Sequence, residues 1–323
     1  MRYFNVAGPC IPGTHYMIDP VTRLKGVERL IDMNQYFVIH AARQSGKTTY
    51  LRELANKLNA SGRYYAFYCS LEGLQGIGDA EKGIPAIVKT IQNALLLSNF
   101  PHAAEFAKDA DYSNFTVILG ASLAQYCRLL DRPLVLLLDE ADCLNESTLI
   151  TFLRQLRNGY NSRDAATPFV HSIALVGMRN IRDFKARIRP DSESLGSISP
   201  FNIVTEALTI KNFTEAEVRA LYQQHTDDTG QLFDADAVAL AYQQTQGQPW
   251  LVNAIAREII VKQLNWDYTQ PVTAGMVAQA IQTIILRRDT HIDSLLERLK
   301  EERVRRVIEP LILGELVNTF TDD

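Results

Sequence analysis

The segment that most constrains the fold is residues 40–50, which read HAARQSGKTTY. Gly46, Lys47 and Thr48 end the phosphate-binding pattern G-x-x-x-x-G-K-[ST], although its first position is Ala41 instead of glycine. A chance Gly-Lys-Thr is common, but this one lies between an apolar run and a helical pattern. A strand, loop and helix in that order point backbone N–H groups and the helix dipole at a phosphate. The sequence therefore predicts a nucleotide site.

Each residue at the end of the loop has an expected role. Gly46 allows the backbone to approach the ligand, Lys47 reaches the β- and γ-phosphates, and the Thr48 hydroxyl binds Mg²⁺. Ala41 costs little if its φ is negative and more if the loop requires a positive φ there. The residues expected to hold the nucleotide phosphates are Ala42, Arg43, Gln44, Ser45, Gly46, Lys47, Thr48 and Thr49.

A second motif lies in residues 133–142, PLVLLLDEAD, an apolar run that ends in acids. Asp139 is expected to hold Mg²⁺ through its water shell, and Glu140 to orient or deprotonate the attacking water. Alone, this pair is equally well explained as a solvated strand end. Together with the upstream loop it matches the Walker B pattern, and the two motifs predict hydrolysis as well as binding.

Apolar runs alternate with helical patterns up to Ile210, after which the pattern becomes helical only. This alternation predicts a parallel sheet that is covered on both faces. The Gly-rich residues 72–83 are expected to form a flexible, partner-facing loop, with Pro85 in the first turn of the next helix. Strands are expected at 36–40, 63–69, 133–142, 169–177 and 202–210, and helices at 21–33, 47–58, 85–98, 116–130, 147–158, 214–226, 234–246, 249–265 and 273–288.

The segment after the strand at 169–177 is polar and basic. If that strand lies between the two motif strands, Arg179 or Asn180 would face the γ-phosphate; the alternative is an ordinary polar loop. Residues 179–190 carry five basic side chains and one acid. Three interpretations stay open, namely an arginine finger from Arg187 or Arg189, a contact with a nucleic-acid backbone, and a solvated surface loop.

These motifs, in this order, resemble the AAA+/STAND branch of P-loop ATPases, and more narrowly the bacterial AAA-like domain ATPases. The resemblance extends over about residues 3–319 and includes FNVAGPC (4–10), ARQSGKTT (42–49), SPFNI (199–203) and GQP (247–249). It implies an α/β P-loop NTPase of the ASCE or AAA+-like type, with a parallel five-stranded sheet in residues 1–210 and an all-helical lid domain in residues 211–318.

The resemblance also implies roles for individual residues. Lys47, Glu140 and Arg179 would be catalytic, with Arg179 near the γ-phosphate, and Pro249 would lie against the nucleotide base. Residues 16–28 would wrap the adenine, with Met17, Ile18 and Arg23 as its contacts. Related proteins often continue into a winged-helix or effector domain, so we expect such a domain to be absent from this chain, which ends at TFTDD.

Composition limits the partners and the compartment. The net charge of -4 argues against general attraction to nucleic acid, although a local patch is compatible with it. The four cysteines form no C-x-x-C pair, which suits a reducing cytosol. No apolar run approaches the roughly 20 residues that span a bilayer. We therefore expect a cytoplasmic protein without a membrane contact.

The sequence predicts an ATP-binding, Mg²⁺-dependent ATPase with slow or regulated turnover. It would act as a nucleotide-controlled switch together with a protein partner, an output domain or further copies of itself. The alternative is a low-turnover, nucleotide-dependent binding module that recruits a nuclease or binds DNA. A metabolic kinase is disfavoured because no motif for a second substrate is present. GTP is disfavoured because the guanine-reading N-K-x-D motif does not occur.

Overall fold

The computed structural model describes residues 1–164, 166–177 and 203–287, which fall into two units. The α/β unit comprises Gly8–Pro12 and Met17–Asn212, and the helical unit comprises Met1–Ala7, Gly13–Tyr16 and the chain from Phe213 onward. The first residues of the chain thus belong with the helices at its other end, although the sequence suggested residues 1–210 as one domain.

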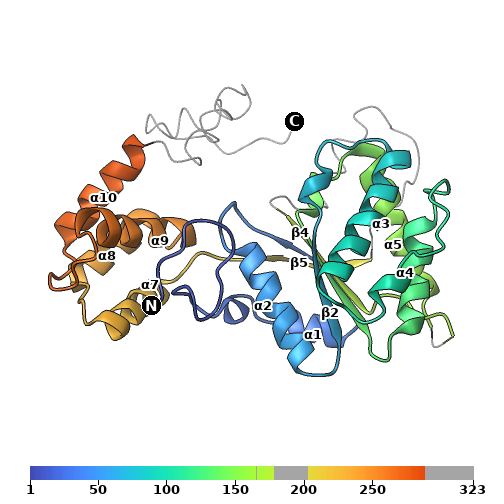
Figure 1. Ribbon diagram of the computed structural model, residues 1–323, viewed down its shortest axis with the longest axis horizontal. Helices are drawn as coiled ribbons and strands as arrows, with labels where there is room; N and C mark the ends of the chain where they lie inside the picture. The colour runs from blue at the N-terminus through green and yellow to red at the C-terminus, as the bar shows by residue number, and fades with distance from the viewer. Residues whose placement is uncertain (165, 178–202, 288–323) are drawn as a thin grey trace, which may run out of the picture. The chain divides into compact units, whose positions relative to one another are not determined.

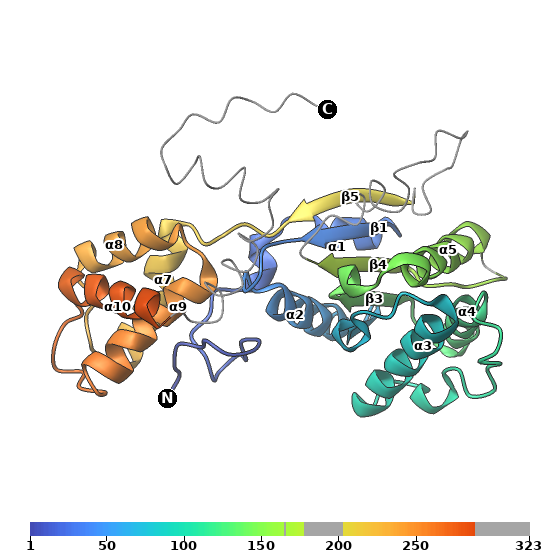
Figure 2. The same ribbon diagram turned by 90° about the horizontal axis from the view of Figure 1, so that it is seen from above.

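One parallel sheet forms the centre of the α/β unit, as Figures 1 and 2 show. Its strands are β1 (Tyr36–His40), β2 (Tyr65–Ser70), β3 (Leu134–Asp139), β4 (Ser172–Gly177) and β5 (Val204–Thr209), in the order β2-β3-β4-β1-β5. Every neighbouring pair is parallel, so the carboxyl ends of all five strands lie at one edge. β4 separates β1 from β3. The predicted parallel five-stranded sheet is confirmed.

The central strands are buried on both faces, and successive side chains enter different cores. Tyr36 and Val38 of β1 join one core, and Phe37 and Ile39 join the other. This alternation is the period of two that a strand imposes. The first core also contains side chains of α3 (Ala80–Leu97), α4 (Ile118–Leu129) and α5 (Glu146–Ser162), and the second those of α1 (Val27–Asp32) and α2 (Lys47–Ala60).

One helix prediction and one loop prediction in this unit were wrong. The expected helix at 21–33 is a 3₁₀ turn, η1 (Pro20–Arg23), followed by α1, because Gly26 adopts a φ of 91° between them. The expected loop at 72–83 contains η2 (Glu72–Leu74) and the first turn of α3. Two further 3₁₀ turns are η3 (Ala103–Glu105) and η4 (Ala141–Cys143).

The start of α3 shows why the prediction failed. The Asp79 side chain accepts a hydrogen bond from the Glu81 N–H and caps the helix there. Such a cap satisfies a backbone donor that the helix leaves free. Pro85 therefore lies inside the helix and not in its first turn.

The helical unit contains α7 (Glu215–Thr229), α8 (Ala235–Thr245), α9 (Pro249–Arg257), a π-helical segment η6 (Glu258–Gln263) and α10 (Ala274–Leu286). A capping box begins α7, since the side chains of Thr214 and Glu217 each bond the other's backbone N–H. The helix expected at 249–265 becomes π-helical in its second half. No helix that the structure describes combines the length and the hydropathy needed to cross a membrane.

Candidate functional site

The two sequence motifs meet at the carboxyl edge of the sheet. The phosphate loop follows β1, and Asp139 is the last residue of β3. The Thr48 hydroxyl donates a hydrogen bond of 2.6 Å to Oδ2 of Asp139, across 91 residues of sequence. The fold therefore brings together the two side chains that the sequence assigned to Mg²⁺.

The loop backbone explains how alanine is accepted at its first position. Gln44 and Gly46 have positive φ values of 56° and 89°, whereas Ala41 is not among the positive-φ residues. Ala41 is buried, and its N–H donates to the Gly177 carbonyl at 3.2 Å. Glycine is thus needed at the end of the loop and not at its start. Residues 42–44 are exposed to solvent.

Lys47 is buried, with 6% of its surface exposed. Its Nζ donates to the carbonyls of Ala41 and Ala42, each at 3.1 Å. Burial lowers the pKa of the ammonium, and the nearby carboxylates of Glu140 and Asp139 oppose that shift. The cation is therefore held between the loop carbonyls and the acids of the second motif.

Two further contacts fix the phosphate loop. The Arg23 guanidinium donates to the Ser45 carbonyl at 3.0 Å and also to the Lys211 carbonyl. The Thr49 hydroxyl accepts a bond of 3.0 Å from the Cys10 N–H. The sequence placed Arg23 near the base; in the structure its guanidinium contacts the loop backbone.

Glu140 follows Asp139 in a conformation that is rare for a non-glycine residue. Its φ is 55° and its ψ is 34°, and its N–H donates to Oδ1 of Asp139 at 3.0 Å. Burial raises the pKa of its carboxyl, Lys47 acts against this shift, and Asp139 and Asp142 add to it. A left-handed non-glycine residue costs roughly 1–3 kcal/mol, and such strain is concentrated at functional sites.

The structure adds Tyr68, a residue of β2, to the candidate site. Its hydroxyl donates to Oδ2 of Asp139 at 3.3 Å, and the Arg52 guanidinium lies 5.2 Å from its ring centre. Burial, together with Asp139, raises the pKa of Tyr68 to about 12. The pairing of Ser70 with Asp139 in the sheet sets this contact, and one sequence does not reveal such a register.

The end of β4 also approaches the second motif. A Cβ at Gly177 would lie 2.2 Å from Oδ1 of Asp142, so a side chain there would force Asp142 to move. Arg179, Asn180, Arg187 and Arg189 lie outside the described residues. Pro249 belongs to the helical unit, where it is buried as the first residue of α9.

The oxygen donors suit Mg²⁺. This ion takes one or two carboxylates and completes its octahedron with water and substrate phosphates. Asp139 and Thr48 offer a carboxylate and a hydroxyl at one point. Within the described parts of the chain, no group of three or more His, Cys, Asp or Glu residues could hold a metal ion. The donor set therefore fits Mg²⁺ completed by phosphate and water.

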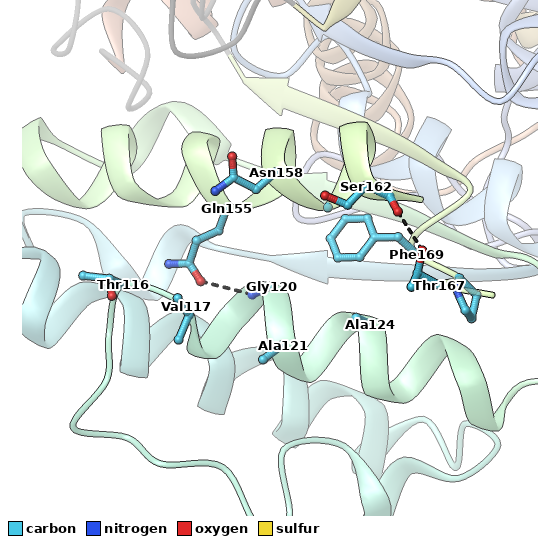
Figure 3. Close-up of a pocket in the computed structure, with 12 residues that line it drawn as sticks. Thr116, Val117, Gly120, Ala121, Ala124, Gln155, Asn158, Ser162, Thr167 and Phe169 are labelled. Atoms are coloured by element: carbon cyan, nitrogen blue, oxygen red, sulfur yellow. Dashed lines mark hydrogen bonds between the residues drawn. The ribbon is translucent and has the colours of Figure 1, made fainter. Parts of the chain in front are cut away.

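A cavity of about 300 Å³ lies between α4 and α5 (Figure 3). In it the Gly120 N–H donates to Oε1 of Gln155 at 3.1 Å, and a Cβ at Gly159 would strike the Phe169 ring at 2.2 Å. None of its described lining residues is charged. It therefore offers no counter-charge for phosphate or metal there, and the sheet edge is the better candidate site.

A parallel sheet with one strand between the two motif strands, followed by helices, defines the P-loop NTPase fold. Residues 32–184 match the model of a family described as AAA domain. At the level of the family, this match supports nucleotide binding and hydrolysis. No curated protein matches the chain.

Solved structures share this fold. A Walker-type ATPase of Pyrococcus abyssi matches with a TM-score of 0.63 and 13% identity, over 94% of this chain and 80% of that one. The Orc1 protein of Aeropyrum pernix, solved in complex with DNA, matches with a TM-score of 0.53 and 15% identity, over 85% and 68% of the two chains. At these identities the likeness concerns the fold alone.

Proposed function

We propose that this protein is an ATP-binding, Mg²⁺-dependent ATPase that works as a nucleotide-controlled switch. The observation that carries the proposal is the hydrogen bond of 2.6 Å between Thr48 and Asp139, beside the buried ammonium of Lys47. A hydroxyl, a carboxylate and a lysine in this arrangement suit a nucleotide polyphosphate with its metal ion.

In the proposed reaction, the Nζ of Lys47 exchanges the carbonyls of Ala41 and Ala42 for β- and γ-phosphate oxygens. Phosphate oxygens compensate the buried charge better than neutral carbonyls do, because they carry negative charge and attract the ammonium by Coulomb's law. Thr48 and Asp139 hold Mg²⁺, which supplies neutralisation of the phosphate charge.

Glu140 is the proposed base. The raised pKa of its carboxyl brings it closer to the operating pH, where a general base works best. The left-handed backbone conformation of Glu140 and the bond from its N–H to Asp139 fix the orientation of this residue. Glu140 would thus accept a proton from water, while Arg179 would stabilise the γ-phosphate.

The switch part of the proposal is supported by Arg23. Its guanidinium joins the carbonyl of Ser45, in the phosphate loop, to that of Lys211, two residues before the helical unit begins at Phe213. A shift of the loop on nucleotide binding would therefore act on the segment that leads into the helices. A partner, an output domain or another copy of the chain would respond to the nucleotide-bound state. In that state Pro249 would lie against the nucleotide base.

The first test is ATP affinity with and without Mg²⁺. We expect the wild type to bind, and Lys47→Ala to weaken binding at least tenfold, which is about 1.4 kcal/mol. Lys57→Ala is the matched control because Lys57 is on the same helix but exposed and paired with Glu28. Absence of binding by the wild type, or equal affinity of the two variants, would refute the site.

The second test separates hydrolysis from binding alone. Glu140→Gln should lower turnover by roughly 10²–10⁴-fold, as expected for a lost general base, and leave ATP affinity unchanged. If the wild type and this variant both bind ATP and are equally inert, the low-turnover binding module that recruits a nuclease or binds DNA becomes the better account.

A further inference from the structure

A second cavity, of about 350 Å³, lies entirely within the helical unit. Most of its walls are aromatic or aliphatic, and among the described residues that line it two are arginines and none is a carboxylate. Small-molecule sites have this size and character, with apolar walls and a few polar groups. The lining residues are Arg2, Tyr3, Phe4, Tyr16, His225, Arg257, Ile260, Val261, Trp266 and Tyr268.

The buried part of this cavity is uncharged. Phe4, Tyr16 and His225 are each at most 5% exposed, and their rings contact one another. The His225 ring is hydrogen-bonded on both sides, to the Tyr16 hydroxyl at 3.3 Å and to Oε1 of Gln231 at 2.8 Å. Burial lowers the pKa of His225, which favours the neutral ring. This surface therefore suits an apolar body.

The two guanidinium groups differ in their partners. The Arg2 guanidinium is already paired, with hydrogen bonds of 2.8 and 3.0 Å to Asp228 and one of 3.1 Å to Gln224. The Arg257 guanidinium forms no hydrogen bond or ion pair with another described residue, and the side chain is exposed. An exposed guanidinium beside an apolar cavity can bind an anionic group of a ligand.

The backbone beside the cavity departs from regular α-helical geometry. The π-helical η6 starts directly after Arg257, and the next segment places Asn265 and Trp266 at φ values of 46° and 64°. Two consecutive left-handed non-glycine residues cost roughly 1–3 kcal/mol each. They hold the Trp266 side chain at 49% exposure on the cavity wall. π-Helical turns occur frequently at functional sites.

We propose that this cavity, named here the helical-unit cavity, binds a small organic monoanion with a flat apolar ring system. Arg257 would pair with the anionic group, and the rings of Trp266 and Tyr268 would contact the body of the ligand. A single charge is favoured because Asp228 is bonded to the cavity residue Arg2, and Asp267 lies between Trp266 and Tyr268 in sequence, and both carboxylates would repel a polyanion. The site would add sensing of a metabolite to the chain, and it does not depend on the proposed ATPase function.

The test uses two fluorescent probes without nucleotide. Anilinonaphthalene sulfonate is a monoanion, and phenylnaphthylamine has the same ring systems without the charge. We expect one sulfonate molecule bound per chain. Arg257→Ala should weaken the sulfonate about tenfold and leave the neutral probe unchanged, because it removes only a charge-assisted contact. Trp266→Ala should weaken both probes.

Arg219→Ala serves as the control, since Arg219 is an exposed arginine on α7 that pairs with Glu215. Circular dichroism and thermal unfolding show whether each variant is folded; if Trp266→Ala is not, Trp266→Leu replaces it, keeping an apolar side chain without the ring. Equal effects of Arg257→Ala and Arg219→Ala on the sulfonate would overturn the proposal. So would displacement of the sulfonate by a single-stranded oligonucleotide, which would indicate a polyanion site.

Discussion

At Gly247 the chain has no room for a side chain. Its φ is 69°, and a Cβ there would lie 1.8 Å from the carbonyl oxygen of Phe213. The Phe213 N–H also donates to the Gly247 carbonyl at 2.8 Å, so the two backbones are held together. This close approach gives a structural reason for the Gly-Gln-Pro sequence before α9.

Gly247→Ala should therefore lower the free energy of unfolding by about 2–4 kcal/mol, through a strained φ and a steric clash. Gly230→Ala is the matched control, because Gly230 has a φ of 77° but no atom within 4 Å of its would-be Cβ. It should cost only about 1 kcal/mol. Chemical denaturation measures both values, and equal losses would show that the Phe213 carbonyl moves away at little cost.

Tyr68→Phe tests the residue that the structure added to the site. Loss of the bond to Asp139 should raise the Mg²⁺ concentration for half-maximal ATPase activity roughly threefold to tenfold, since the removed bond is worth about 1 kcal/mol. Tyr65→Phe removes a bond from the same strand to Asp131 and should leave this value unchanged. A Mg²⁺ titration of turnover compares them, and identical curves would mean that Tyr68 only packs.

Sequence reasoning proposed Lys47, Thr48, Asp139 and Glu140 as site residues because each has a fixed position in a recognisable motif, and the structure places Thr48 and Asp139 in contact. It could not locate Tyr68 or the contact between Gly177 and Asp142. Those contacts depend on how strands align in the sheet and on which side chains pack at its edge. Neither property can be predicted from the spacing of residues within one segment.

Among the helices, capping decided which boundaries were predictable. The Thr214 cap with its partner Glu217 has a spacing that the sequence displays. The Asp79 cap of α3 lies in a Gly-rich stretch and has no such partner. Pro85 is therefore the stronger sequence signal for the start of this helix, and it predicts the wrong boundary. The π-helical η6 was missed because a single π-helical turn is rare and has no sequence signature comparable to a capping residue.

The role of this cap is testable. Asp79→Ala should lower the free energy of unfolding by about 1 kcal/mol, because the Glu81 N–H loses its acceptor. Asp79→Asn retains an acceptor oxygen and should recover most of that loss. Thermal or urea unfolding distinguishes the two variants. If they are equally destabilised, the carboxylate acts through its charge and not as a cap.

At the scale of the whole molecule, stability should fall below about pH 6.5. Burial lowers the pKa of His225 from the 6.5 of a free side chain, so the unfolded chain binds a proton that the folded chain does not. This contribution to stability is present at pH values above the pKa of the histidine in the unfolded chain, and it is lost as the pH falls below that pKa. His15 and His171 shift in the same direction and add to this loss.

His225→Gln should therefore reduce the drop in melting temperature between about pH 7.5 and pH 5.5, while lowering the melting temperature at both values. Glutamine does not titrate in this range, and its amide can still bond Tyr16 or Gln231. The groups facing His225 are the tyrosines Tyr16 and Tyr268 and the Arg2–Asp228 pair. An unchanged drop in the variant would assign the effect to the other histidines.

The path of the chain has a practical consequence for protein engineering. Residues 1–7 and 13–16 belong with the helices after Phe213, and residues 8–12 belong with the sheet. Phe4 and Tyr16 are part of the buried aromatic cluster of the helical unit. A single cut near residue 212 would thus leave the helical fragment without part of its own interior, and would leave residues 1–7 and 13–16 on the α/β fragment without the helices they belong with. Expressing the helices alone would require grafting the amino-terminal segment onto them, for example as a circular permutant.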